Sequence, residues 1–231
     1  MENVTIPGEN FHQPLPSQNI KHPLLVNWLA HFFSFVFHPL FIPTLATWYL
    51  TFLQSGYFTG TPTDEKRMVI LQVAFNTILY PALTVVLLKA VGFIKSILLK
   101  TQRERIIPYI ATNIFYFWMY LVFKSQDEIP SVLTSFIFGI FLASSLALIA
   151  NIYFKISMHA LGIGALCGLM IVIIFTGFSY VIFLPAMIVF LIAGLVGTSR
   201  LVVSNHTPFD IYSGILLGIL CQFIASMFIG Q

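Results

Sequence analysis

The chain has 231 residues, of which 58% are hydrophobic and only 8% are charged, and its formal net charge is +3. This composition indicates a polytopic membrane protein and excludes an ordinary soluble domain. The positive charge is too small, and too concentrated in a few segments, for nucleic-acid binding to be expected.

The first part of the chain, through His22, is polar and carries several prolines. It lacks the basic region, short apolar core and small-residue cleavage site of a secretory signal, so we expect no cleavable signal peptide. We predict a polar N-terminal tail over residues 1–26 and a single transmembrane domain over residues 27–231.

Seven stretches are apolar over the length of about 20 residues that a membrane-spanning helix needs. We therefore predict an all-α, polytopic transmembrane bundle of six to seven spans with its functional site at one membrane face. The predicted spans cover residues 28–53, 68–91, 106–123, 130–154, 159–177, 180–197 and 211–229. Pro39 and Pro43 are expected to kink the first span, and its His31 and His38 are interpreted as helix-packing groups.

The connections between these spans determine which polar segments share a membrane face. A charged turn at residues 124–129 joins spans three and four, and residues 178–179 join spans five and six. Because each hairpin returns to the face on which it began, the basic connector 95–108 and the stretches 155–159 and 199–210 should all emerge on one face. Three segments that are distant in sequence can therefore converge.

Charge is rare in the second half of the chain. From residue 129 to the C-terminus the only Lys, Arg, Asp or Glu residues are Lys155, Arg200 and Asp210. Ionisable groups at membrane depth are costly and by default mark a functional site. Together with the connector, the shared face should hold several cations, two histidines and one acid, a set that suits an anionic phosphate handled without a metal. These groups are Lys100, Arg103, Arg105, Lys155, Arg200, Ser157, His159, His206 and Asp210.

The spacing Ser199-Arg200, five residues, His206, three residues, Asp210 resembles the third signature of the type 2 phosphatidic acid phosphatase superfamily. This superfamily includes membrane lipid phosphatases and soluble vanadium haloperoxidases. The stretch Ile156-Ser157-Met158-His159 is similar to the second signature, Pro-Ser-Gly-His, and keeps its serine and histidine.

The first signature, a lysine, six residues and then Arg-Pro, is met only in part. Lys100 and Pro108 fit it, but Ile107 stands where arginine is expected, and the nearest arginines are Arg105 and Arg103. The resemblance covers residues 100–231.

This resemblance implies a double-displacement phosphatase that needs neither metal nor cofactor. His206 would attack phosphorus to form a phosphohistidine, and Asp210 would accept the other imidazole N–H. His159 would protonate the leaving group and then activate water.

The resemblance also implies the phosphate ligands. Arg200, with Arg105 and Lys100, would neutralise the phosphate oxygens, and Ser157 would donate a further hydrogen bond.

Other interpretations of single residues stay open. Asp210 could act as the N-cap of the last helix, expected to begin at Ile211, and Ser157 could cap the fifth. Lys155 is interpreted as an anchor that snorkels to the interface. The basic residues of the connector could instead contact lipid headgroups.

Two glycine pairs have the spacing of closely packed transmembrane helices. They are Gly164 with Gly168 in the fifth span and Gly214 with Gly218 in the last. We interpret them as packing residues and as weak evidence for dimerisation, and the oligomeric state stays open.

The function that these patterns favour is hydrolysis of a lipid phosphate monoester or pyrophosphate, with membrane lipids as the other partners. Two alternatives remain: a lipid phosphotransferase with the same phosphohistidine, and a non-catalytic transporter or scaffold with a phosphate site. A haloperoxidase is disfavoured because those relatives are soluble.

The membrane orientation depends on how the basic residues are counted. The positive-inside rule would place the site in the cytoplasm, but most of the basic excess belongs to expected phosphate ligands. The related lipid phosphatases face away from the cytoplasm. We therefore expect a multi-pass protein of the cell (inner) membrane with an extracytoplasmic site, the N-terminus outside and the C-terminus inside.

Overall fold

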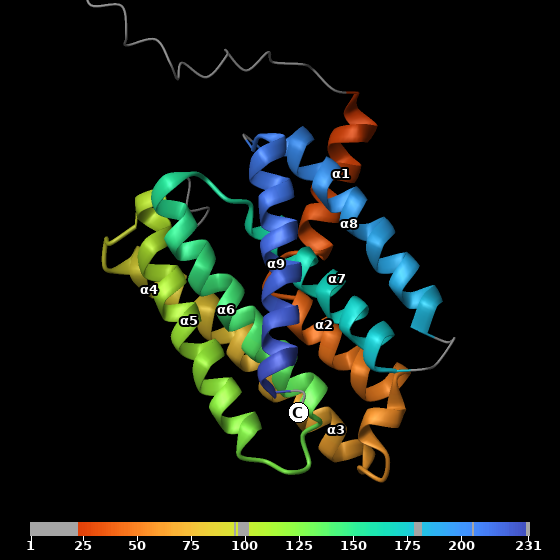
Figure 1. The fold of residues 1–231 in the computed structure, drawn as a ribbon. Coiled ribbons are helices and arrows are strands. Elements are labelled where there is room, and N and C mark those ends of the chain that lie inside the picture. The colour runs from red at the N-terminus through yellow and green to blue at the C-terminus, as the bar shows by residue number, and fades with distance from the viewer. Residues whose placement is uncertain (1–22, 95, 97–101, 178–181, 205, 230–231) are drawn as a thin grey trace, which may run out of the picture.

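The computed structural model describes residues 23–94, 96, 102–177, 182–204 and 206–229, and these form a bundle of helices without a strand (Figure 1). Within this part of the chain, six helices are long and apolar enough to cross a membrane. The prediction of an all-α multi-pass membrane protein is therefore confirmed. The six are α3–η3–α4 (Thr63–Ala74, Phe75–Leu79, Tyr80–Ala90), α5 (Gln102–Lys124), α6 (Ser131–Tyr153), α7 (Met158–Thr176), α8 (Phe183–Val203) and α9 (Pro208–Ile229).

The first predicted span is two helices rather than one kinked helix. Helix α1 (Leu24–Val36) stops before Pro39, and α2 (Ile42–Trp48) continues into the π-helical turn η1 (Tyr49–Leu53). Pro39 has no N–H to donate and restricts the residue before it, so the helix cannot continue through this point. The N–H of Phe41 instead donates to the carbonyl of His38 at 2.8 Å, which closes a turn. His38 consequently lies in a bend and not within a helix.

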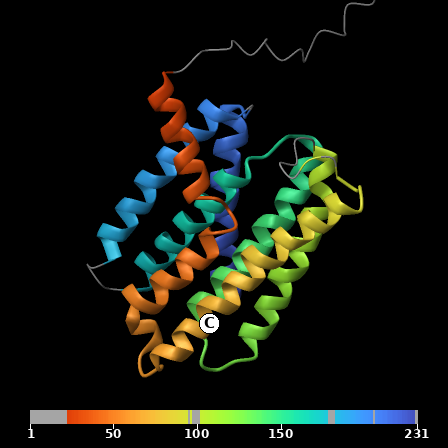
Figure 2. The same cartoon turned by 180° about the vertical axis from the view of Figure 1, so that it is seen from behind.

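Helix α9 packs between α6 and α7, and α8 packs against α7 and α1. The figures show α4, α5 and α6 on one side of the bundle and α1, α2, α7 and α8 on the other, with α3 packed against α2 (Figures 1 and 2). The turn between α5 and α6 falls where the sequence predicts it, because α5 ends at Lys124 and α6 begins at Ser131.

Helices α7 and α9 approach closely because each carries glycine where the two meet. A Cβ atom on Gly164 would lie 2.4 Å from the carbonyl oxygen of Ile215, and one on Gly218 would lie 2.4 Å from that of Leu161. Neither position has room for a side chain. The interpretation of these glycines as packing residues is confirmed. Gly214 meets Ser157 and Ala160 at the start of α7, whereas Gly168, farther along α7, meets Ile219 and Gln222 farther along α9, so the two helices are parallel.

Parallel packing places the beginnings of α7 and α9 side by side. The backbone N–H of Ser157 donates to the carbonyl oxygen of Asp210 at 3.2 Å. The predicted convergence of residues 155–159 with residues 199–210 is thus confirmed for these two segments. Helix α8 extends to Val203, six residues beyond the predicted end, so Arg200 lies in its last turn rather than in a loop.

Candidate functional site

Asp210 lies in the first turn of α9, where it helps to begin the helix. Its Oδ2 accepts the N–H of Thr207 at 2.8 Å, and the hydroxyl of Thr207 accepts the N–H of Asp210 at 3.2 Å. This reciprocal pair is a capping box, with Pro208 at the first helical position. The helix begins at Pro208 and not at Ile211 as expected, so Thr207 is the N-cap and Asp210 contributes to the cap from the first turn. The Thr-Pro-Phe-Asp pattern was the signal for this start.

The same carboxylate faces the imidazole of His206. Oδ2 of Asp210 lies 3.5 Å from Nδ1 of His206, whose side chain is only 5% exposed. This separation is longer than that of a well-formed hydrogen bond, and Nδ1 has no hydrogen-bond partner among the described residues. Because Nδ1 faces the carboxylate, Nε2 is the nitrogen directed away from it.

His206, between α8 and α9, is held in its neutral form. Burial, followed by the positive charges of Arg200 and Lys155, lowers the pKa of His206 from 6.5 to about 4, although the Asp210 carboxylate acts in the opposite direction. A neutral imidazole has a lone pair on one nitrogen, which is what a nucleophile or base requires. Lys155, interpreted as an interfacial anchor on the shared face, therefore lies close enough to influence His206.

Arg200 and His159 are both held by one residue of α1. Nη1 of Arg200 donates to the hydroxyl of Ser34 at 3.3 Å, and Nε2 of His159 lies 3.0 Å from the carbonyl oxygen of Ser34. The rings of His38 and His159 meet edge to face, with centroids 5.1 Å apart. Arg200 interacts electrostatically with all three imidazoles, those of His38, His159 and His206.

Ser34 and His38 are site residues that the sequence patterns do not single out. His38 packs between helices as expected, but its neighbour is the predicted site residue His159, whereas His31, interpreted in the same way, is exposed. The available signal was the rule that ionisable groups at membrane depth mark a site.

Ser157 serves as the N-cap of α7. Its hydroxyl accepts the N–H of Ala160 at 3.4 Å, and the residue is fully buried. The capping interpretation is confirmed. Its contribution to phosphate binding stays a prediction, since a serine hydroxyl that accepts one bond can still donate another.

The basic connector is described mainly where α5 begins. Lys100 lies outside the described residues, as do the side chains of Arg103 and Arg105 in the first turn of α5. The hydroxyl of Tyr109, farther along α5, contacts the sulfur of Met158 at the start of α7. One side chain of α5 thus reaches the start of α7, and phosphate binding by Lys100 and Arg105 stays a prediction.

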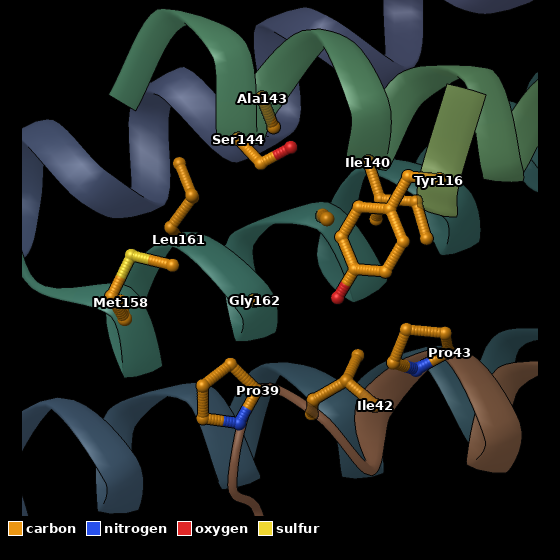
Figure 3. A pocket seen from close by; sticks show the side chains of 11 residues that line it. Pro39, Ile42, Pro43, Tyr116, Ile140, Ala143, Ser144, Met158, Leu161 and Gly162 are labelled. Atoms are coloured by element: carbon orange, nitrogen blue, oxygen red, sulfur yellow. The ribbon is translucent and has the colours of Figure 1, made fainter. Parts of the chain in front are cut away.

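A small, mainly apolar crevice lies within the bundle (Figure 3). Pro39 and Met158 lie at one end, each next in sequence to a histidine of the cluster, and the ring of Tyr116 lies at the other. Residues of α2, α5, α6 and α7 line it, namely Pro39, Ile42, Pro43, Tyr116, Ile140, Ala143, Ser144, Met158, Leu161, Gly162 and Ala165.

Within the described residues, no three His, Cys, Asp or Glu side chains gather in a way that could hold a metal ion. The arrangement instead combines a neutral imidazole beside a carboxylate with a guanidinium and a second imidazole. Such a set can bind an anion and transfer protons near it.

The fold and the site define a multi-pass helical membrane protein with a polar cluster at the helix ends. Comparisons of the chain with protein-family models, with curated proteins and with solved structures found no match.

Proposed function

We propose that this chain is an integral-membrane phosphatase that hydrolyses a lipid phosphate monoester or pyrophosphate through a phosphohistidine on His206. The observation that carries the proposal is the pairing of a buried, neutral His206 with Asp210, beside Arg200 and a second histidine, His159. The signature spacing of these residues supports membership of the type 2 phosphatidic acid phosphatase superfamily, which is part of the proposal.

In the first half of the reaction, Nε2 of His206 attacks phosphorus while the bond from phosphorus to the leaving oxygen breaks. The positive charge that develops on the ring is stabilised by Asp210, which lies 3.5 Å from Nδ1. His159, which carries a second proton on Nδ1 once the substrate phosphate is bound, gives that proton to the departing alkoxide or phosphate and becomes neutral. One difficult displacement is thus divided into two easier ones.

In the second half, His159 takes a proton from water, and the resulting hydroxide attacks the phosphohistidine and releases inorganic phosphate. Arg200 neutralises the phosphate oxygens in both halves, an electrostatic contribution typically of several kcal/mol. Arg105, Lys100 and Ser157 are proposed as the further phosphate ligands.

The lipid character of the substrate is supported by the position of the cluster. Its polar groups lie at the ends of membrane-spanning helices, where a headgroup meets the bilayer surface. The apolar crevice beginning at Pro39 and Met158 offers a lining suited to part of the lipid tail. We further propose that the protein lies in the cell (inner) membrane with this face extracytoplasmic.

The test is phosphate release by purified protein from a panel of lipid phosphates and pyrophosphates in EDTA. We expect the His206→Ala variant to be inactive, and His31→Ala, which removes an exposed histidine of α1, to retain wild-type activity. Equal release by His206→Ala and wild type would contradict the mechanism. Adding a hydroxyl acceptor distinguishes a hydrolase from a phosphotransferase, because only the latter yields a new phosphoester.

A further inference from the structure

Helix α1 lies outside the part of the chain that resembles any signature, yet it contacts two proposed site residues. Ser34 is 8% exposed and uses both of its oxygens, the hydroxyl for Arg200 and the carbonyl for His159. His38, four residues later, packs the edge of its ring against His159. One short segment thus holds a guanidinium and an imidazole that come from two different helices, α8 and α7.

The contact with Ser34 determines the tautomer of His159. A carbonyl oxygen can only accept a hydrogen bond, so the hydrogen of a neutral His159 must be on Nε2. Nδ1 then carries the lone pair. No second hydrogen bond of this ring is found within the described residues, so Nδ1 is the atom left for proton transfer.

His38 is itself fixed at one nitrogen. Its Nδ1 accepts the N–H of Leu40 at 3.4 Å in the bend that follows α1. The ring is thereby held at an interplanar angle of 85° to that of His159. Edge-to-face contact of this kind restricts rotation of the neighbouring ring, so His38 limits how His159 can turn about its bond to the backbone.

We propose that Ser34 and His38 are positioning residues of the phosphatase site, which hold Arg200 against the phosphate and keep Nδ1 of His159 directed at the leaving oxygen. This inference rests on the proposed function. It assigns to α1 the supporting role that precise catalytic geometry requires, since small misplacements of reacting groups cost large factors in rate.

Substitutions separate the two contacts. Ser34→Ala removes the hydroxyl that Arg200 uses but keeps the carbonyl that His159 uses, whereas Ser34→Thr keeps both. Because a hydrogen bond to a charged group contributes about 1.5–3 kcal/mol, we expect Ser34→Ala to weaken binding of inorganic phosphate about tenfold or more. Ser34→Thr should restore binding to near the wild-type value.

His38→Phe keeps a ring of similar size but removes the bond to Leu40. It should lower kcat by about tenfold or more through misplacement of His159, with inorganic phosphate bound as tightly as by wild type. His31→Ala, on the same helix but exposed, is the control and should change neither quantity.

A readout independent of turnover is the side-chain ¹⁵N spectrum of His159 in detergent-solubilised full-length protein. We expect a protonated Nε2 and an unprotonated Nδ1 in wild type, and a mixture of tautomers in His38→Phe. The inference is overturned if both variants keep wild-type phosphate affinity and kcat, or if the neutral His159 of the phosphate-free protein carries its hydrogen on Nδ1 instead of Nε2. A wild type that releases no phosphate from any lipid overturns the proposed function instead, and phosphate binding together with the ¹⁵N spectra then still decides the inference.

Discussion

Asp210 performs two tasks with one oxygen atom. Oδ2 accepts the Thr207 N–H at the start of α9 and also faces Nδ1 of His206. The helix start therefore fixes the carboxylate opposite the imidazole, where the proposed mechanism needs it. A capping interpretation and a catalytic one, which compete at the level of the sequence, are compatible in this geometry.

Two substitutions distinguish these tasks. Asp210→Asn keeps an oxygen that can accept the Thr207 N–H but removes the charge that faces His206. We expect kcat to fall by about 10³-fold or more, with little loss of stability. Thr207→Ala removes a capping hydroxyl and should cost about 1 kcal/mol of stability while activity is largely kept. Equal activity of the two variants, measured as phosphate release at matched folded fraction, would contradict an orienting role for Asp210.

The lowered pKa of His206 gives a pH prediction. His206 should remain neutral, and able to attack phosphorus, as the pH falls from 7 to about 4, and be protonated only below that value. After correction for ionisation of the substrate phosphate, kcat/KM should therefore fall near pH 4, where His206 becomes protonated and can no longer attack phosphorus. A loss centred near 6.5, the ordinary value for histidine, would show that burial and the nearby cations do not act as inferred.

At the scale of the helices, the site depends on how closely α7 and α9 pack. Their glycine contacts bring the Ser157 end of α7 to the Asp210 end of α9. No catalytic side chain takes part in these contacts. Even so, a change there would separate two walls of the site.

Gly218→Ala tests this dependence, because its Cβ would lie 2.4 Å from the carbonyl oxygen of Leu161 and 2.6 Å from the backbone nitrogen of Ala165. We expect a loss of about 1–3 kcal/mol in stability, as for other overpacked cores, and a lower kcat. Gly194→Ala in α8 is the matched control, since its Cβ would meet nothing within 4 Å. It should be neutral or slightly stabilising. Thermal unfolding and phosphate release measure both, and an unaffected Gly218→Ala would refute the dependence.

The helices themselves could be predicted from the sequence, because length and hydropathy determine which segments can cross a membrane. Their ends were less predictable. Helix α8 includes Arg200 because its C-terminal turn tolerates a charge, and α9 begins three residues early because Thr207 and Asp210 cap each other. Pro39 indicates the break after α1, but only the folded chain shows that α1 then reaches α8.

At the scale of the whole molecule, α1 begins at one end of the bundle and α9 ends at the other (Figures 1 and 2). Reporter tags at the two chain ends should therefore lie on opposite faces of the membrane. With an extracytoplasmic site, the N-terminal tag should be outside and the C-terminal tag inside. Protease protection in spheroplasts measures this directly. Tags on the same face would contradict the topology, and the reverse assignment would contradict only the orientation.

The packing of whole helices explains which parts of the site could be predicted from the sequence. Because each helical hairpin returns to the face on which it began, the order of the spans and the signature spacing are enough to place four site residues on one membrane face. These are His159, Arg200, His206 and Asp210. Nothing local connects these residues to Ser34 or His38, because that contact arises only when α1 packs on α8 and its bend meets α7. Residues that meet through helix packing have no characteristic separation in the sequence, so no motif identifies them.

The central claim is that phosphorus becomes bonded to His206 during turnover. Its most direct measurement is rapid acid-free quenching of the purified protein with a ³²P-labelled lipid phosphate in EDTA, followed by peptide mapping. We predict an alkali-stable, acid-labile label on the peptide that contains His206, present in His31→Ala and absent in His206→Ala. Phosphate release without any label on His206, or label retained by His206→Ala, would contradict the mechanism.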